Sequence, residues 1–298
     1  MTADSGATAF VFAGGGSLGA VQVGMLQALL EAGVRPDFVI GTSVGALNAA
    51  YFAGAPDLDG VARLAGVWRG LRRHDIFPVS FASAMRLLRN PESLVDPAGL
   101  RALVEAQLPF RLLEDAALPL HVMATDLAGI GVRLSSGPAV EAVMASAAIP
   151  GVFPAVTVGG RPLVDGAIAA NTPLRQACDL GARRIIVLPT GYACDLKRPP
   201  RGVVGQAMHA ITLLIAWQLM HEIATTPPGI RLHMAPALCP LRVSPFDFSH
   251  SAELITRAFA RTRNWIRRGG LERQARAREL APHHHDRRAA VAAVQERA

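Results

Sequence analysis

Short apolar runs alternate with helical patterns over the first two thirds of the chain. The apolar runs predict strands at residues 7–14, 37–42, 120–127, 131–136 and 183–190. Apolar positions at helical spacing and Ala-rich segments predict helices at residues 17–33, directly after Ser43, at 140–148 and at 173–180. Residues 155–167 (AVTVGGRPLVDGA) predict a β-hairpin that turns at Gly159-Gly160. This alternation predicts an α/β fold of three layers, with a mostly parallel central sheet and helices on both of its faces.

Two segments depart from this regular alternation. Residues 77–118 contain a loop (NPESLVDPAG) between short amphipathic pieces, which fits either a surface-facing cap or an ordinary helical insertion. The longest uncharged stretch, Val203 to Met220, carries Gln206, His209 and Gln218, so a buried helix is a better interpretation than a membrane span. We therefore expect one domain at residues 8–270, with its core motifs at 8–190 and a helical C-terminal part at 200–270, followed by a basic, flexible tail at 271–298.

Composition and charge narrow the class of protein. The chain has 298 residues, 51% of them hydrophobic, which is enough for one large core. Its net charge of +7 belongs to one end, because residues 257–298 hold 11 arginines against 4 acids and the remainder is neutral. Such an end is either a solvated helix face or a contact for an anionic membrane. We expect no nucleic-acid partner, and the sequence leaves the oligomeric state open.

Three cysteines, odd in number and widely spaced, give neither a metal pair nor a disulfide framework. The first six residues lack the basic start of a secretory signal. Both observations predict a cytoplasmic protein, with peripheral attachment to a membrane as the alternative.

Residues 41–45 (GTSVG) place Ser43 between two glycines, after a predicted strand and before a predicted helix. This is the sequence of a sharp strand-to-helix turn that exposes a nucleophilic serine, and Gly41 and Gly45 leave room around it. Only 42 residues precede Ser43. Because an ordinary α/β-hydrolase with a Ser-Asp-His triad needs more elements before its serine, that class is disfavoured, and His209, His221, His233 and His250 are interpreted as structural.

Residues 14–20 (GGGSLGA) allow two interpretations. Gly14, Gly16 and Gly19 match a dinucleotide-binding fingerprint, but no acidic residue follows the second strand to bind a ribose. Alternatively, a glycine loop at a helix N-terminus presents backbone N–H groups to an anion, including the oxyanion that forms during acyl transfer. The loop precedes Ser43 by one strand and one helix, which favours the second interpretation.

A candidate base lies much later in the chain, in the pair Asp165-Gly166 at the end of the predicted hairpin. An aspartate followed by glycine is often only a turn residue. Taken alone, Asp165 is as well explained by that role as by catalysis.

Four segments in order resemble the patatin-like phospholipase family: GGGSLG (14–19), GTSVG (41–45), the block ATDLAGIGVRLSSGPAVEAVMASAAIPGVFPAV (124–156) and LVDGA (163–167). The resemblance covers roughly residues 8–190. It implies a Ser–Asp dyad without histidine, in which Ser43 is the nucleophile and Asp165 the base. It also implies that Gly14, Gly15, Gly16 and Ser17 form the oxyanion hole, and that neither a metal nor a cofactor is required. Asp126 is then a structural residue that holds its loop through backbone hydrogen bonds.

The function that this resemblance implies is hydrolysis of lipid acyl esters, of phospholipase A or lysophospholipase type, through an acyl-enzyme. Three alternatives stay open: an esterase or thioesterase for another acyl substrate, an acyltransferase, and a module with weak activity that binds lipid or a partner protein. One position departs from the family, since many members have Arg or Lys where this chain has Leu18. That change is expected to affect contact with an acidic head group rather than the backbone donors.

Overall fold

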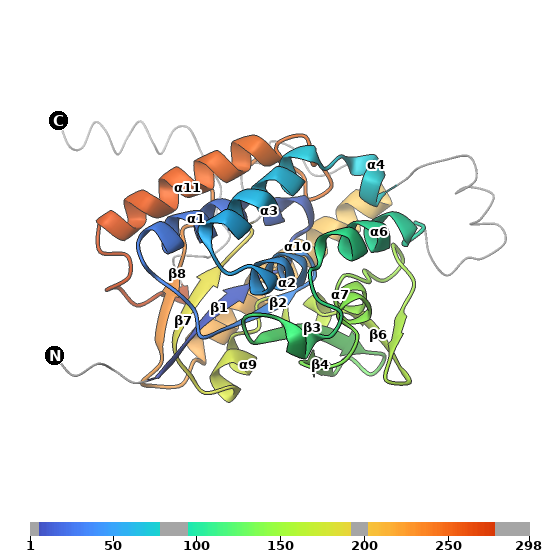
Figure 1. Cartoon of the computed structure of the whole chain (residues 1–298), viewed down its shortest axis with the longest axis horizontal. Helices are drawn as coiled ribbons and strands as arrows, with labels where there is room; N and C mark the ends of the chain where they lie inside the picture. Colours follow the sequence, from blue (N-terminus) through green and yellow to red (C-terminus); the bar gives the residue numbers. More distant parts are fainter. Residues whose placement is uncertain (1–5, 78–94, 192–201, 278–298) are drawn as a thin grey trace.

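The centre of the molecule is an eight-stranded sheet (Figure 1). A computed structural model describes residues 6–77, 95–191 and 202–277. Each strand in the path β5-β6-β3-β2-β1-β7-β8 is hydrogen-bonded to the next, and β4 also pairs with β3. Their bounds are β1 Ala7–Phe12, β2 Phe38–Thr42, β3 Leu120–Asp126, β4 Gly131–Leu134, β5 Val156–Val158, β6 Arg161–Asp165, β7 Ala182–Leu188 and β8 Arg231–Met234. Strands β3, β2, β1, β7 and β8 are parallel to one another, as predicted. Strands β4, β5 and β6 form antiparallel pairs.

Strand β3 brings two distant segments together. β4 pairs with β3 over Val122–Thr125, so the other strands paired with this part of β3 must use its opposite edge. β2 runs parallel to β3 along that edge and ends at Thr42, opposite Met123. β6 runs in the reverse direction along the same edge and ends at Asp165, opposite Ala124. The carboxyl ends of β2 and β6 therefore meet on one edge of β3, one residue apart in its register.

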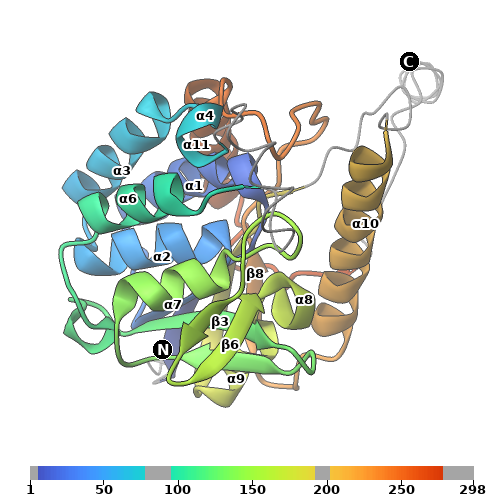
Figure 2. The same cartoon turned by 90° about the vertical axis from the view of Figure 1, so that its right-hand side faces the viewer.

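Helices cover both faces of the sheet, so the three layers expected from the sequence are present (Figure 2). One face is covered by α1 (Ala20–Glu31), α2 (Val44–Gly54), α3 (Leu58–Gly70), α6 (Ala98–Gln107), α7 (Ala139–Ser146) and α11 (Ser251–Arg267). The other face is covered by α8 (Ala167–Ala170), α9 (Leu174–Asp179) and α10 (Val203–Ala224). Shorter elements are η1 (Gly16–Gly19), α4 (Arg73–Ile76) and η2 (Leu113–Asp115). The larger hydrophobic core lies under the first group of helices and a smaller one under the second.

Two predictions for the C-terminal part were wrong. The stretch from Val203 to Met220 is helical, within α10, but it is not buried, since Leu214 is 69% exposed. Within this stretch Ala216 and Met220 are buried, whereas Ile211, Leu214 and Trp217 are exposed, so its apolar residues lie on both sides of the helix. The region at 200–270 is also not purely helical, because β8 adds a parallel edge strand to β7. β8 has only four residues, RLHM, and two of them are polar, so it lacks the apolar run that marks the central strands.

The predicted domain boundary at residue 270 stays a prediction. Part of the segment predicted to be a flexible tail contacts the sheet edge: the Leu232 N–H donates to Gln274 Oε1 at 3.0 Å, and the Ala275 N–H donates to the Leu232 carbonyl oxygen at 2.8 Å. Residues 278–298 lie outside the described ranges, as does much of the predicted cap at 77–118. None of the helices in the described ranges has the length and apolarity that crossing a bilayer requires.

Candidate active site

Ser43 occupies the sharp turn between β2 and α2. Its φ of 55° and ψ of −127° make it the one non-glycine residue with positive φ in the described part of the chain. Such a conformation is costly for a residue with a side chain, and it persists only where the surroundings enforce it. Here the flanking glycines allow it: a Cβ at Gly41 would lie 2.4 Å from the Gly45 carbonyl oxygen, and one at Gly45 would lie 2.3 Å from the Phe12 carbonyl oxygen. The turn therefore has the geometry of a nucleophile elbow.

Asp165 lies directly beside Ser43, as the meeting of β2 and β6 requires. The Ser43 hydroxyl donates a hydrogen bond of 2.7 Å to Asp165 Oδ2. The second carboxylate oxygen, Oδ1, accepts the Ala167 N–H at 2.8 Å, which orients the side chain. Both residues are almost fully buried, with 7% of Ser43 and 3% of Asp165 exposed. The structure thus brings together the two residues that the sequence proposed as nucleophile and base.

Burial raises the pKa of Asp165 to about 6, although the hydrogen bonds from the Ala167 N–H and the Ser43 hydroxyl act in the opposite direction. An ordinary aspartate is a weak base, and a raised pKa increases its affinity for a proton taken from serine. At neutral pH the carboxylate is still mainly ionised. Asp165 therefore combines the ionised form with more than the usual basicity.

The glycine loop lies against the serine. A Cβ at Gly14 would lie 3.2 Å from the Ser43 Cβ. The Gly14 N–H donates to the Asn171 carbonyl oxygen at 3.0 Å, and the Ser17 N–H donates to the Pro245 carbonyl oxygen at 2.7 Å. Within the described ranges, the N–H groups of Gly15 and Gly16 have no such acceptor. Of the four residues expected to form an oxyanion hole, these two therefore have donors free for a ligand.

Close packing explains why this loop contains glycine. Gly15 and Gly16 have φ values of 155° and 58°, which side chains rarely adopt. A Cβ at Gly15 would lie 2.2 Å from Thr190 Oγ1, and one at Gly16 would lie 2.4 Å from the Pro245 carbonyl oxygen. Leu18 is buried and does not line either of the cavities that reach Ser43. The residue that departs from the family pattern thus points into the core rather than toward a substrate.

Two hydroxyl residues that the sequence analysis did not single out hold this site in place. The Ser43 N–H donates to Ser146 Oγ at 2.8 Å, and the Ser146 hydroxyl in turn donates to the Met123 carbonyl oxygen. The Thr125 hydroxyl donates to the Asp165 carbonyl oxygen at 2.9 Å. All of these groups are buried. Ser146 could have been found from the sequence, because it is the one serine in the apolar stretch EAVMASAAIP. A buried hydroxyl needs a hydrogen-bond partner, so its presence there indicates a structural contact.

The histidines and Asp126 lie apart from the Ser43–Asp165 pair. In the part of the chain that the structure describes, neither residue of this pair hydrogen-bonds to a histidine. His233 Nδ1 is 3.1 Å from the Arg273 carbonyl oxygen, and His250 contacts Glu253. Asp126 Oδ1 accepts the N–H groups of Ala128 and Ile130, so it holds its own turn, as predicted.

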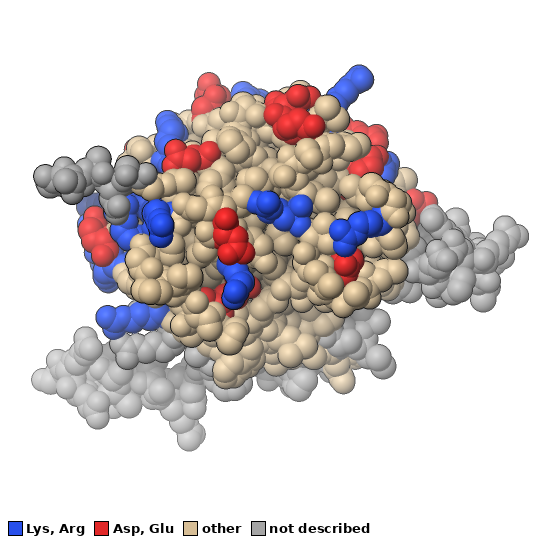
Figure 3. Space-filling model, turned by 90° about the horizontal axis from the view of Figure 1, so that it is seen from below, with Lys and Arg blue, Asp and Glu red and all other residues tan. Residues whose placement is uncertain are grey.

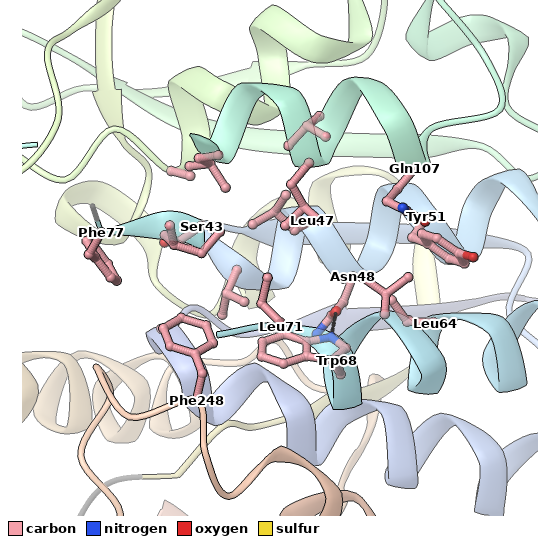
Figure 4. A pocket seen from close by; sticks show the side chains of 18 of the residues that line it. Ser43, Leu47, Asn48, Tyr51, Leu64, Trp68, Leu71, Phe77, Gln107 and Phe248 are labelled. Atoms are coloured by element: carbon pink, nitrogen blue, oxygen red, sulfur yellow. Dashed lines mark hydrogen bonds between the residues drawn. The ribbon is translucent and has the colours of Figure 1, made fainter. Parts of the chain in front are cut away.

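An inner cavity extends from Ser43 between α2, α3 and α6, with a free volume of about 100 Å³. Figure 4 shows Ser43 near one end, Leu47 and Leu71 along its length, and Tyr51 with Gln107 toward the far end. Two of its polar side chains are paired with each other, since Trp68 Nε1 donates to Asn48 Oδ1 at 2.9 Å. The remaining lining is almost entirely apolar, so the cavity suits a hydrocarbon group.

An outer cavity of about 480 Å³ adjoins the same serine. It is bounded by the glycine loop, Asp165, α8, α10 and the segment Pro245-Phe246. Unlike the inner cavity, it is lined by Ser43, Asp165, Gly15 and Gly16 together. Among the described residues no group of three or more His, Cys, Asp or Glu side chains could hold a metal ion. The arrangement offers a buried hydroxyl, a carboxylate and two free N–H donors at the meeting point of two apolar cavities.

The fold and this site define a three-layer α/β protein in which a buried serine at a sharp strand-to-helix turn is hydrogen-bonded to an aspartate. A family model for patatin-like phospholipase matches residues 10–178, more than half of the chain. The chain therefore belongs to the patatin-like phospholipase family.

Curated relatives are similar to the chain over somewhat less than two thirds of its length. Patatin-like phospholipase domain-containing protein 7 of Rattus norvegicus is 30% identical over 189 residues, which are 62% of this chain and 14% of that protein. Lysophospholipase NTE1 of Cryptococcus neoformans is 28% identical over 194 residues, or 62% of this chain and 11% of that protein. The chain thus spans less than a fifth of the length of the relatives it matches.

Solved structures resemble the chain over most of its length but at low identity. VipD from Legionella pneumophila is 16% identical, with a TM-score of 0.48, and the match covers 91% of this chain and 67% of that one. Human GIVD cytosolic phospholipase A2, in complex with methyl gamma-linolenyl fluorophosphonate, is 14% identical, with a TM-score of 0.46, and the match covers 90% and 59%.

Proposed function

We propose that this protein hydrolyses fatty-acyl esters of lipids, with Ser43 as nucleophile and Asp165 as base. The observation that carries the proposal is the buried 2.7 Å hydrogen bond from the Ser43 hydroxyl to Asp165 Oδ2, inside an apolar cavity and beside unengaged N–H groups. Membership of the patatin-like phospholipase family supports a lipid as the substrate class.

The first half of the reaction transfers the acyl group to the serine. Asp165 Oδ2 accepts the Ser43 proton as Oγ attacks the ester carbonyl carbon. The carbonyl oxygen becomes an oxyanion, which the N–H groups of Gly15 and Gly16 stabilise. When the tetrahedral intermediate collapses, the bond to the alcohol breaks and the proton on Asp165 passes to the leaving oxygen. An acyl-serine remains.

The second half repeats these steps with water. Asp165, ionised again, accepts a proton from a water molecule that attacks the acyl-serine. Collapse returns the proton to Ser43 and releases a fatty acid. Both cavities are apolar, which fits the hydrocarbon part of the substrate and keeps the aspartate in the environment that raises its pKa.

A fluorophosphonate probe, together with turnover of a soluble ester, tests the dyad. Ser43→Ala is expected to abolish labelling and to lower kcat/KM by roughly 10³-fold or more. Asp165→Asn is expected to lower kcat/KM by roughly 10²- to 10⁴-fold, since the amide cannot accept the proton. Ser136→Ala and Asp126→Asn are matched controls outside both cavities and are expected to keep near-normal turnover. Near-normal activity of Asp165→Asn would place the base elsewhere.

The pH profile gives a second readout. Only ionised Asp165 can accept the serine proton, so kcat/KM is expected to fall tenfold per pH unit below a pKa near 6 and to be level above it. A limb with an apparent pKa near 4 would mean that the carboxylate is solvated in the working enzyme, and the proposed role of burial would be wrong.

A further inference from the structure

Helix α10 turns Gln218 and Glu222 toward the protein, beside its buried apolar residues Ala216, Met220 and Ile223. Gln218 Nε2 donates to the Ala169 carbonyl oxygen at 2.9 Å, and Gln218 Oε1 accepts the Asn171 N–H at 3.1 Å. One turn later, Glu222 Oε2 accepts the Leu174 N–H at 3.1 Å. Positions four apart lie on the same side of a helix, so these two side chains together satisfy backbone groups around α8 and the start of α9.

The outward side of the same helix is mainly apolar, although His221 is exposed there too. Leu214 is 69% exposed and Trp217 is 62% exposed, and Ile211 is also exposed. A helix between a protein and water normally has the reverse arrangement, with its apolar side inward. α10 has apolar residues on its buried side, but it also places large apolar side chains on its outer side, which favours an apolar surrounding there.

Neighbouring elements extend this surface. Ile168 on α8 is exposed, as are Leu127 and Ile130 in the turn between β3 and β4. That turn adjoins α8, since a Cβ at Gly131 would lie 3.3 Å from the Ala169 Cβ. In the described part of the chain, six of the eight exposed large hydrophobic residues belong to this group, which we call the apolar face: Leu127, Ile130, Ile168, Ile211, Leu214 and Trp217.

Charge is distributed accordingly. Figure 3 views the molecule from below, with the side that carries α10 in Figure 2 at the bottom of the view. Acidic and basic side chains gather in its upper part, whereas the described part of its lower edge shows none. At the turn that carries Leu127 and Ile130, the charges of Asp126 and Arg161 are paired with each other at 3.0 Å. An apolar partner would therefore bury the face without leaving this pair unmatched.

The apolar face also surrounds the way into the site. Ile168, Ile211 and Leu214 all line the outer cavity, which contains Ser43 and Asp165. A lipid could therefore pass from an apolar phase in contact with this face to the serine without crossing water. A second copy of the chain bound here would instead cover the opening.

We propose that the apolar face inserts into the surface of a lipid bilayer and that substrate enters the outer cavity from it. The proposal rests on the proposed function for its choice of occupant. Insertion is shallow and apolar, with the Trp217 indole at the level of the lipid head groups. It differs from contact through the basic C-terminal end, because α11 lies on the other side of the sheet from α10 (Figure 2).

Flotation of the full-length protein with phosphatidylcholine vesicles tests this surface. Trp217→Gln and the double variant Leu127→Gln/Ile130→Gln avoid both cavities, and each is expected to weaken binding roughly tenfold. Leu58→Gln, a control at an exposed leucine on α3, is expected to bind like wild type. All variants are expected to keep their melting temperature and their turnover of a soluble short-chain ester. Brominated lipid chains are expected to quench tryptophan fluorescence in wild type and much less in Trp217→Gln.

The proposal is overturned if Trp217→Gln and Leu127→Gln/Ile130→Gln both bind vesicles as well as wild type does. It is also overturned if the Leu58→Gln control loses as much vesicle binding as they do. A wild-type dimer that Trp217→Gln converts to a monomer overturns it too, since the face is then a contact between copies. Ser43→Ala separates this proposal from the proposed function. If Ser43→Ala and wild type both bind vesicles but wild type hydrolyses no ester, the surface stands and the activity is wrong. If wild type hydrolyses esters while the variants bind normally, the activity stands and the surface is wrong.

Discussion

Helices α10 and α11 are the two longest in the described part of the chain, and they are built in opposite ways. α11 buries Leu254, Ile255 and Ala258 in the main hydrophobic core, where it packs against α1, and turns its arginines to solvent. α10 turns Gln218 and Glu222 inward and Leu214 outward. The difference teaches that apolar residues do not by themselves identify the buried side of a helix, because α10 exposes Leu214 and Trp217 while it buries Met220.

The largest expected contrast between the two helices is in stability. Leu254→Ala empties a fully buried position in α11 and is expected to lower the free energy of unfolding by about 2–5 kcal/mol. Leu214→Ala in α10 is expected to change it by less than about 0.5 kcal/mol, because that side chain is mostly exposed. Urea unfolding followed by circular dichroism measures both. A comparable loss in the two variants would show that the outer side of α10 is covered in solution.

A smaller effect concerns how α10 is attached. Burial raises the pKa of Glu222 to about 7, against the hydrogen bonds from the Leu174 and Arg175 N–H groups. Folding therefore favours the protonated form of Glu222. Its contribution to the free energy of unfolding is fully present below about pH 4.5, declines toward pH 7 and is lost above that pH. Glu222→Gln keeps an acceptor without the charge. Relative to wild type, it is expected to be neutral at pH 4.5 and to stabilise by roughly 1 kcal/mol at pH 8.

The control for this comparison is Glu253→Gln in α11. Glu253 is solvent-exposed, and its pKa is lowered by hydrogen bonds from Arg257 and His250, so its contribution has the opposite sign with pH. Asp165 also titrates, but it is present in wild type and in both variants and cancels in each difference. If Glu222→Gln is no more stable than wild type at pH 8, the carboxylate of Glu222 is hydrated and α10 is attached more loosely than its hydrogen bonds indicate.

The smallest expected effect is that of the arginines on α11. If the apolar face is the membrane contact, Arg263→Gln/Arg267→Gln is expected to change binding to phosphatidylcholine vesicles less than twofold. An arginine close to an anionic membrane contributes about 1 kcal/mol, so these two would together matter by more than tenfold if α11 were the contact. Repeating the flotation assay with vesicles containing phosphatidylglycerol decides between them. A loss of that size, removed by high salt, would move the contact to the basic end.

The sequence predicted the site better than its surroundings. Gly14–Ser17, Ser43 and Asp165 lie together in the structure, and this proximity could be predicted because turn geometry depends on local sequence and four motifs follow in order. The catalytic roles of these residues stay predictions. Which donors stay free was not predictable, since the partners of Gly14 and Ser17 are Asn171 and Pro245, far away in the chain.

The C-terminal part was predicted least well for a physical reason. α10 is apolar around most of its circumference, so periodicity could not tell which side faces the protein. Hydrogen bonds to backbone groups around α8 and α9 help to orient α10. Gln218 is the partner of two of these groups, the Ala169 carbonyl oxygen and the Asn171 N–H. Such contacts belong to the assembled tertiary structure and leave no trace in the hydrophobic pattern of the helix.

The meeting of β2 and β6 on one edge of β3 makes hydrolysis a readout of strand registration. Thr42 pairs with Met123 and Asp165 with Ala124, so slippage of either strand by two residues would keep its buried side chains buried yet move Ser43 and Asp165 apart by roughly 7 Å. A misregistered sheet could thus look native in its secondary structure and still lack the hydrogen bond. Regain of turnover during refolding would report the last step of sheet assembly, which far-ultraviolet circular dichroism does not see.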